Sequence, residues 1–168
     1  RRLEWMIQTL AFADARYTLH FMLTGDSAYQ KKLKSIAEKL VPGRVFFHSP
    51  VVPAEIVAAL HQFDMGFYLL HTRNYNNASA LPNKFFDFIQ AGLGVCVGPS
   101  PEMARLIRQY GFGLNADSFE PRAVAERLNQ LTAADVDRFK LAALEARSVL
   151  CADVEMKKML SLYEKAAL

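Results

Sequence analysis

Short apolar runs that alternate with helical patterns constrain the fold of this chain more than any other feature. The runs are rich in β-branched, aromatic and aliphatic residues, and they cover residues 17–24, 44–48, 64–70, 93–97 and 111–114. Strands that alternate with helices of about 10–15 residues indicate βαβ units and a parallel sheet. Because such crossovers are right-handed, the pattern predicts an α/β fold, a Rossmann-like parallel sheet with helices on both faces.

The helical stretches set the expected organisation of the domain. Helices are predicted over residues 2–14, 28–41, 53–61, 82–91, 101–110, 120–130, 132–149 and 152–167. We therefore expect a single domain over residues 1–168, with an α/β core in 1–130 and C-terminal helices in 131–168. The chain opens on Arg1-Arg2 without Met and enters a helix at once. A doubly wound fold normally starts on a strand, so we expect a piece of a longer protein whose first strand lies upstream.

Composition excludes several classes of protein. Apolar residues make up 52% of the chain and charged residues 22%, which is typical of a globular domain with a core. A net charge of +3, without Lys/Arg clusters interleaved with aromatics, does not support nucleic-acid binding. No apolar run reaches the ~18 residues that a membrane span needs.

The two cysteines, Cys96 and Cys151, bear on metals and on location. No Cys-x-x-Cys or Cys/His spacing is present, so we predict no metal site. Two lone thiols fit a reducing compartment, and we expect a cytoplasmic protein. The lysine-rich helix 28–41 fits either contact with the inner face of the membrane or an ordinary solvated surface.

Polar loops after the strands are the candidate ligand site, because open parallel sheets bind ligands beyond the carboxyl ends of their strands. The loop 71–83 joins a buried strand to a helix whose first N–H groups and dipole favour a phosphate. Lys84 adds a positive charge there. Asp87, one turn later, fits either a hydrogen bond to ribose hydroxyls or a solvated pair with Lys84.

Two histidines, His48 and His71, end strands at the same edge and are further candidates, although structural roles also fit them. No Gly-x-Gly-x-x-Gly, Walker loop, Gly-x-Ser-x-Gly or paired-carboxylate motif occurs. The residues therefore predict a binding face without a catalytic apparatus of its own.

The segment 82–113 resembles the donor-site segment of family 4 glycosyltransferases, which have the GT-B fold. The family pattern Pro-(Ser/Asn)-Lys-x-x-(Glu/Asp)-x-x-x-x-Gly is matched by Pro82, Asn83, Lys84, Asp87 and Gly92. A buried strand, Pro-Glu and Gly-x-Gly follow, as in the family. Looser similarities cover residues 23–26, 45–51, 60–64 and 151–168.

This resemblance implies the C-terminal, donor-binding half of a retaining glycosyltransferase. Such an enzyme transfers a sugar from a nucleotide-diphosphate sugar to a glycan or lipid-linked acceptor, without a metal or another cofactor. By the same resemblance, Asp87 holds the ribose, while Lys84 and the amides around Asn83 face the diphosphate. The loop with His71 and Ser79 lies beside the sugar.

Two other segments enter the implied donor site. Gly25 lies in the turn that follows the first predicted strand, and its segment resembles the family's strand and turn. Phe47, His48 and Ser49 flank the base. Ser79 stands where many members of the family carry a Glu. The resemblance places the catalytic residues in an N-terminal acceptor domain, so we expect the isolated domain to be inactive.

A different class of function also fits the residues. In that alternative the chain is a non-catalytic Rossmann-like module that binds a nucleotide or a partner protein, which the departure at Ser79 keeps open. A receiver-type domain is disfavoured because Asp26 and Asp64 are not placed to form an acidic pocket.

Overall fold

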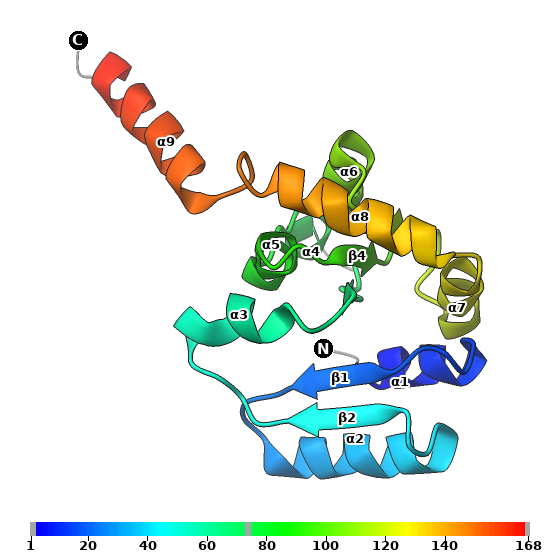
Figure 1. Cartoon of the computed structure of the whole chain (residues 1–168). Coiled ribbons are helices and arrows are strands. Elements are labelled where there is room, and N and C mark those ends of the chain that lie inside the picture. The colour runs from blue at the N-terminus through cyan, green and yellow to red at the C-terminus, as the bar shows by residue number, and fades with distance from the viewer. Residues whose placement is uncertain (1–2, 73–74, 167–168) are drawn as a thin grey trace.

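Short parallel strands with helices between them form the architecture that the alternation predicts (Figure 1). This computed structural model describes residues 3–72 and 75–166. The strands are β1 (Leu19–Met22), β2 (Val45–His48), β3 (Met65–Tyr68), β4 (Gly94–Val97) and β5 (Gly113–Asn115). The helices are α1 (Leu3–Phe12), α2 (Ser27–Leu40), η1 (Pro53–Glu55), α3 (Ile56–Leu60), α4 (Tyr75–Ala78), α5 (Asn83–Gln90), α6 (Pro101–Tyr110), α7 (Pro121–Asn129), α8 (Ala133–Ala146) and α9 (Ala152–Ala166).

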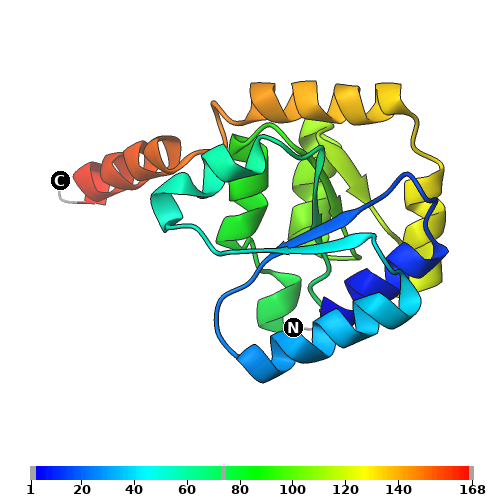
Figure 2. The same ribbon diagram turned by 60° about the horizontal axis from the view of Figure 1, so that its bottom comes forward.

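The strands pair in two separate parallel sheets. β1 pairs with β2, so that Leu19 lies opposite Val45. The second sheet has the order β3-β4-β5, with Met65 opposite Gly94. Among the described residues no ladder joins β1 to β3, and the two sheets are seen apart in Figure 1. In Figure 2 the blue and cyan strands, β1 and β2, pass in front of the larger sheet. The predicted parallel α/β class is therefore confirmed, but the strands do not form one continuous sheet.

Strand β4 is the centre of the larger sheet and is buried along its whole length. Val95 and Val97 pack against α5 and α6, in a cluster that includes Phe85 and Met103. Cys96 belongs to a different cluster, with residues of β5 and α7. Because both faces of β4 are covered by helices, its sequence is apolar without alternation, as expected for a parallel strand.

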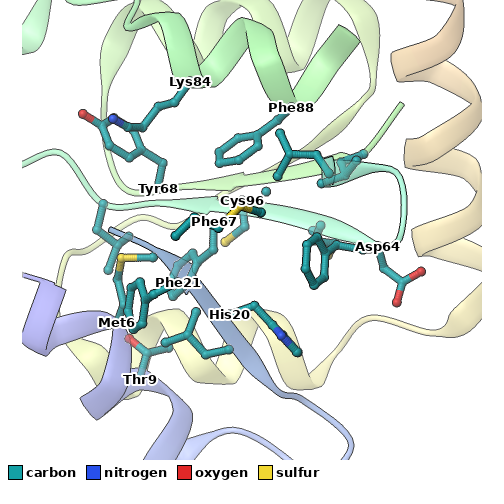
Figure 3. Close-up of a pocket in the computed structure, with 18 of the residues that line it drawn as sticks. Met6, Thr9, His20, Phe21, Asp64, Phe67, Tyr68, Lys84, Phe88 and Cys96 are labelled. Atoms are coloured by element: carbon teal, nitrogen blue, oxygen red, sulfur yellow. The ribbon is translucent and has the colours of Figure 1, made fainter. Parts of the chain in front are cut away.

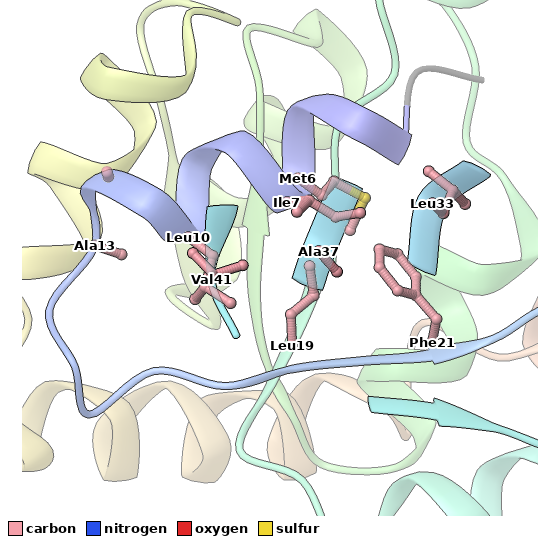
Figure 4. Close-up of a cluster of buried hydrophobic side chains, with 10 residues drawn as sticks. Met6, Ile7, Leu10, Ala13, Leu19, Phe21, Leu33, Ala37 and Val41 are labelled. Atoms are coloured by element: carbon pink, nitrogen blue, oxygen red, sulfur yellow. The ribbon is translucent and has the colours of Figure 1, made fainter. Parts of the chain in front are cut away.

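The core of the smaller sheet lies between β1, α1 and α2 (Figure 4). Ile7 of α1 and Leu33 of α2 are completely buried there, and Phe21 of β1 packs between these helices. Ala125 of α7 belongs to the same cluster, and α1 packs along α7. This contact between α1 and α7 links the smaller sheet to the helices that cover the larger one.

Local signals end the helices near the predicted residues. Asp26 caps α2 by accepting a hydrogen bond from the Ala28 N–H at 2.8 Å. Gly111 ends α6 in the left-handed conformation, with φ 75°. A capping box of Thr132 and Asp135 starts α8.

Two segments differ from the sequence prediction. The helix predicted over 53–61 begins as the 3-10 turn η1 before it becomes α3, and the predicted loop 71–81 contains the short helix α4.

No helix in residues 3–72 and 75–166 has the length and apolar character that crossing a membrane requires.

Candidate functional site

A large cavity lies between β1 and β3 and reaches the carboxyl end of β3 (Figure 3). Its volume is about 1630 Å³, and α1, β1, β3 and α5 contribute to its wall. His71, Asn83, Lys84 and Asp87 all line it. Four of the residues that the family resemblance assigned to the donor thus line the same cavity, whereas Ser79, which was assigned to the sugar, does not.

Helix α5 turns its polar residues to the cavity because its apolar residues anchor it to the core. Phe85 and Ile89, one turn apart, are completely buried. Lys84 and Asp87, three residues apart, share the side of α5 that lines the cavity. The helix is capped by Pro82 without a side-chain hydrogen bond, so its dipole presents a positive end at Asn83.

The Lys84 side chain lies over the aromatic ring of Tyr68, the last residue of β3. Its Nζ atom is 5.3 Å from the ring centre, within the range of a cation–π contact. Figure 3 shows both side chains together at one end of the cavity. A strand end therefore positions the cation at the start of α5.

Asp87 is half-buried beside this cation. Burial raises the pKa of the Asp87 carboxyl above its usual 3.8, and the charge of Lys84 acts in the opposite direction. A partly desolvated carboxylate gains from hydroxyl donors that replace its lost water. This environment suits an acceptor for ligand hydroxyls.

His71 follows β3 and is held by aromatic rings. Its imidazole stacks on Phe119, with ring centres 4.9 Å apart, and lies 5.6 Å from the Trp5 ring. The Nδ1 atom is buried without a hydrogen-bond partner among the described residues. Asn77 of α4 donates a hydrogen bond from its Nδ2 to the His71 carbonyl at 2.9 Å, so α4 holds this loop. A buried ring nitrogen without a partner costs stability, and a hydrogen bond to this atom would remove that cost.

The remaining predicted site residues do not line the cavity. Ser79 is exposed at the end of α4, and its N–H donates to the Tyr75 carbonyl at 2.9 Å. Gly25 adopts a left-handed φ of 95°, and its carbonyl accepts from the Gln30 side chain at 3.4 Å. Ser49 is exposed. Thr24 and Pro50, the neighbours of Gly25 and Ser49, do reach the cavity wall.

Phe47 and His48 of β2 make contacts within the smaller sheet. Phe47 packs on Phe21, with ring centres 5.5 Å apart, and is half-buried. His48 Nε2 lies 2.8 Å from His20 Nδ1, so one imidazole donates to the other. Burial lowers the pKa of His20, and His48 lowers it further. These contacts place both β2 residues apart from the Lys84 and Asp87 wall.

Tyr68 and Asn77 are site residues that the sequence analysis missed. A tyrosine at the carboxyl end of an apolar strand is a detectable signal, because its polar tip needs a partner when the ring is buried. Asn77 offered no such signal, since it is one of several Asn residues in a polar loop.

Cys96 also lines the cavity, from β4. Burial raises the pKa of the Cys96 thiol to about 12, so this cysteine is a protonated core residue. Residues 3–72 and 75–166 contain no group of three or more His, Cys, Asp or Glu side chains arranged to hold a metal ion.

Comparison with known proteins gives a likeness of fold. No protein-family model matches the chain, and no curated protein matches its sequence. Among solved structures, the fold is similar to WaaG, a glycosyltransferase involved in lipopolysaccharide biosynthesis, with a TM-score of 0.64 and 19% sequence identity. The superposition covers 99% of this chain and 42% of the WaaG chain, so the chain spans less than half the length of that protein.

Proposed function

We propose that this domain binds a nucleotide-diphosphate sugar and is the donor-binding half of a retaining glycosyltransferase. The observation that carries the proposal is the pairing of Lys84 and Asp87 on the cavity wall at the start of α5. A cation and a helix N-terminus bind a diphosphate, and a half-buried carboxylate one turn away binds ribose hydroxyls. The likeness of fold to a glycosyltransferase supports it.

The same groups would assist the chemistry as well as binding. When the bond between sugar and diphosphate breaks, negative charge develops on the departing phosphate. Lys84 and the dipole of α5 stabilise that charge without rearrangement, and Tyr68 fixes the position of the ammonium. The proposal needs no metal ion or other cofactor.

Acceptor binding and the catalytic residues belong, in this proposal, to a second domain. The chain spans 42% of the WaaG chain, which leaves room in a protein of that length for such a domain. The acceptor would be a glycan or a lipid-linked glycan, reached from the cytoplasmic side of the membrane. The isolated domain would bind donor weakly and would not turn over.

The test is a titration of UDP, GDP, ADP and their sugar conjugates, followed by ligand-observed NMR. We expect one nucleotide diphosphate to bind, and Lys84→Ala and Asp87→Ala to weaken its binding. Lys31→Ala removes an exposed lysine of α2 that does not line the cavity, and serves as the matched control. Equal affinity of all four proteins would overturn the proposed site.

Each contact can be tested separately with a modified nucleotide. Lys84→Ala should weaken a nucleoside diphosphate more than the corresponding monophosphate. Asp87→Ala should weaken the natural diphosphate but leave its 2′,3′-dideoxy form unchanged, because that ligand has no ribose hydroxyls to lose. If no nucleotide binds to the wild-type domain, the results favour the alternative function, a non-catalytic module that binds a partner protein.

A further inference from the structure

A second hollow lies beside β5, at the edge of the larger sheet. Its volume is about 430 Å³, within the ~300–1,000 Å³ of typical binding pockets. Residues of α6, β5, α7 and α8 contribute to its wall. We call it the edge groove. Asn83, Lys84 and Asp87 do not line it, so the edge groove is separate from the wall proposed to bind the donor.

Strand β5 turns its unpaired side to the edge groove. In the part of the chain that the structure describes, β5 pairs only with β4. The Ala116 N–H donates to the Val97 carbonyl at 2.8 Å, on the β4 side. Because backbone groups alternate along a strand, those of Gly113 and Asn115 point away from β4, and both residues line the edge groove. Their N–H and carbonyl groups are therefore available to an added strand.

Three exposed arginines surround this edge, namely Arg108 of α6, Arg127 of α7 and Arg138 of α8. Within residues 3–72 and 75–166 the Arg108 side chain has no hydrogen bond or ion pair. Arg127 donates to the neutral Gln130 side chain at 3.4 Å. Only Arg138 meets a carboxylate among these residues, that of Asp135 at 2.7 Å. The edge groove thus carries excess positive charge and favours an anionic partner.

Arg108 and Arg127 flank the edge from opposite faces of the sheet. Helix α6 packs in the cluster that contains Val95, and α7 packs in the cluster that contains Cys96. Neighbouring residues of a strand point to opposite faces, so the two helices cover opposite sides of β4. A strand laid along β5 would alternate in the same way. Adjacent acidic residues on it would place one carboxylate toward each arginine.

We propose that the edge groove binds an extended acidic segment of a partner protein, which adds to β5 as a further strand. The backbone of Gly113 and Asn115 pairs with the segment, and its Asp or Glu side chains pair with Arg108 and Arg127. Because β5 has three residues at ~3.3 Å each, about four residues of the partner suffice. A small anion would leave the strand edge unpaired, so the two observations together favour a peptide. This inference is independent of nucleotide binding.

The test is a titration with a defined peptide, followed by the amide NMR signals of the domain. The probe is a capped peptide with the sequence Gly-Asp-Glu-Asp-Glu-Gly. We expect the amide signals of Gly113 and Asn115 to shift and to saturate. The uncharged counterpart, Gly-Asn-Gln-Asn-Gln-Gly, should bind at least about tenfold more weakly.

Paired substitutions test the arginines. Arg108→Gln combined with Arg127→Gln should weaken the acidic peptide about tenfold at about 0.15 M salt, where distant exposed charges are screened. Arg105→Gln combined with Arg122→Gln removes the same charge from the same two helices, at exposed residues that do not line the edge groove. This matched control should bind as the wild-type domain does.

A modified peptide tests the strand edge without changing the protein. N-methylation of every Asp and Glu keeps the charges but removes the N–H groups that pair with a strand, and should abolish binding. Equal affinity of the methylated peptide, or equal affinity of the two double variants, would overturn the inference. So would the absence of shifts at Gly113 and Asn115. Equal shifts with inorganic phosphate would show a site for small anions in place of a peptide groove.

Discussion

The ammonium of Lys84 lies 5.3 Å from the centre of the Tyr68 ring, which joins the start of α5 to the carboxyl end of β3. Tyr68 ends β3 and Lys84 lies in the first turn of α5, and the segment between these two elements contains His71 and the short helix α4. The aromatic face attracts the cation and restricts where it can go. Lys84 is therefore held at the wall where the diphosphate is proposed to bind.

Replacement of Tyr68 tests this positioning. Tyr68→Leu removes the aromatic face and should weaken nucleotide-diphosphate binding about two- to fivefold, since an exposed cation–π contact contributes about 0.5–1 kcal/mol. Tyr68→Phe keeps the face and should bind as wild type does. Isothermal titration calorimetry on the three proteins measures the effect. If Phe weakens binding as much as Leu, the hydroxyl and not the ring is the important group.

At neutral pH the Asp87 carboxylate should lower the stability of the fold but strengthen nucleotide binding. Its folded-state pKa is raised by burial, so the protonated form is favoured by folding, and this contribution to stability is lost as pH rises through the raised pKa. At neutral pH the carboxylate therefore costs stability, and Asp87→Asn should raise the melting temperature while weakening nucleotide binding.

The pH dependence of Asp87 provides the second readout. Nucleotide affinity should fall as pH is lowered toward the raised pKa, beginning above the 3.8 of an ordinary Asp, and Asp87→Asn should abolish that fall. Thermal melts and titrations over the same pH series measure both effects. A lower melting temperature for Asp87→Asn at neutral pH would show that the carboxylate stabilises the fold.

Gly111 and Gly113 match the same family pattern but should differ in their sensitivity to Ala. Gly111 has a left-handed φ of 75° and open space around it, so Gly111→Ala should cost about 1 kcal/mol of unfolding free energy. A Cβ on Gly113 would lie 2.0 Å from the Val95 carbonyl oxygen. Because that atom belongs to the paired backbone of β4, Gly113→Ala should cost about 3 kcal/mol.

Urea unfolding of the two glycine variants gives the comparison. The variants differ from wild type by the same methyl group, so each is the control for the other. Equal losses of unfolding free energy would mean that β5 moves away from β4 to admit the methyl group.

The helices and the wall of α5 could be predicted because their signals are local. Apolar spacing places Phe85 and Ile89 in the core, and the same spacing puts Lys84 and Asp87 on a shared side. Capping residues such as Asp26 fix helix ends in the same way. Residues within one or two turns determine these features, so sequence periodicity is enough.

Features that join distant segments were not predictable in this way. Periodicity identifies β1 and β3 as strands but does not say which strands pair, so the separation of the sheets was missed. The contact of Lys84 with Tyr68 also depends on how two elements pack. The short helix α4 was also not predicted, because it contains Asn76 and Asn77 and Asn has a weak helical propensity.

His20 should make the fold sensitive to mild acid. Its ring stacks on Phe46 at 4.8 Å and meets His48 and the Thr18 hydroxyl. Burial first, and His48 second, lower its folded-state pKa below 6.5, so folding favours the neutral ring. This contribution to stability is complete above pH 6.5 and is lost as pH falls through the folded-state pKa.

Substitution by Gln separates this effect from general acid destabilisation. His20→Gln should lower the melting temperature near neutral pH, because stacking is lost, but should flatten its decline between neutral pH and about pH 5. His61→Gln removes an exposed histidine of the loop after α3 and should leave the decline unchanged. Melting temperatures across this range provide the measurement. A decline as steep in His20→Gln as in wild type would assign the acid sensitivity to other groups, and equal flattening in His61→Gln would remove the special role of the His20–His48 contact.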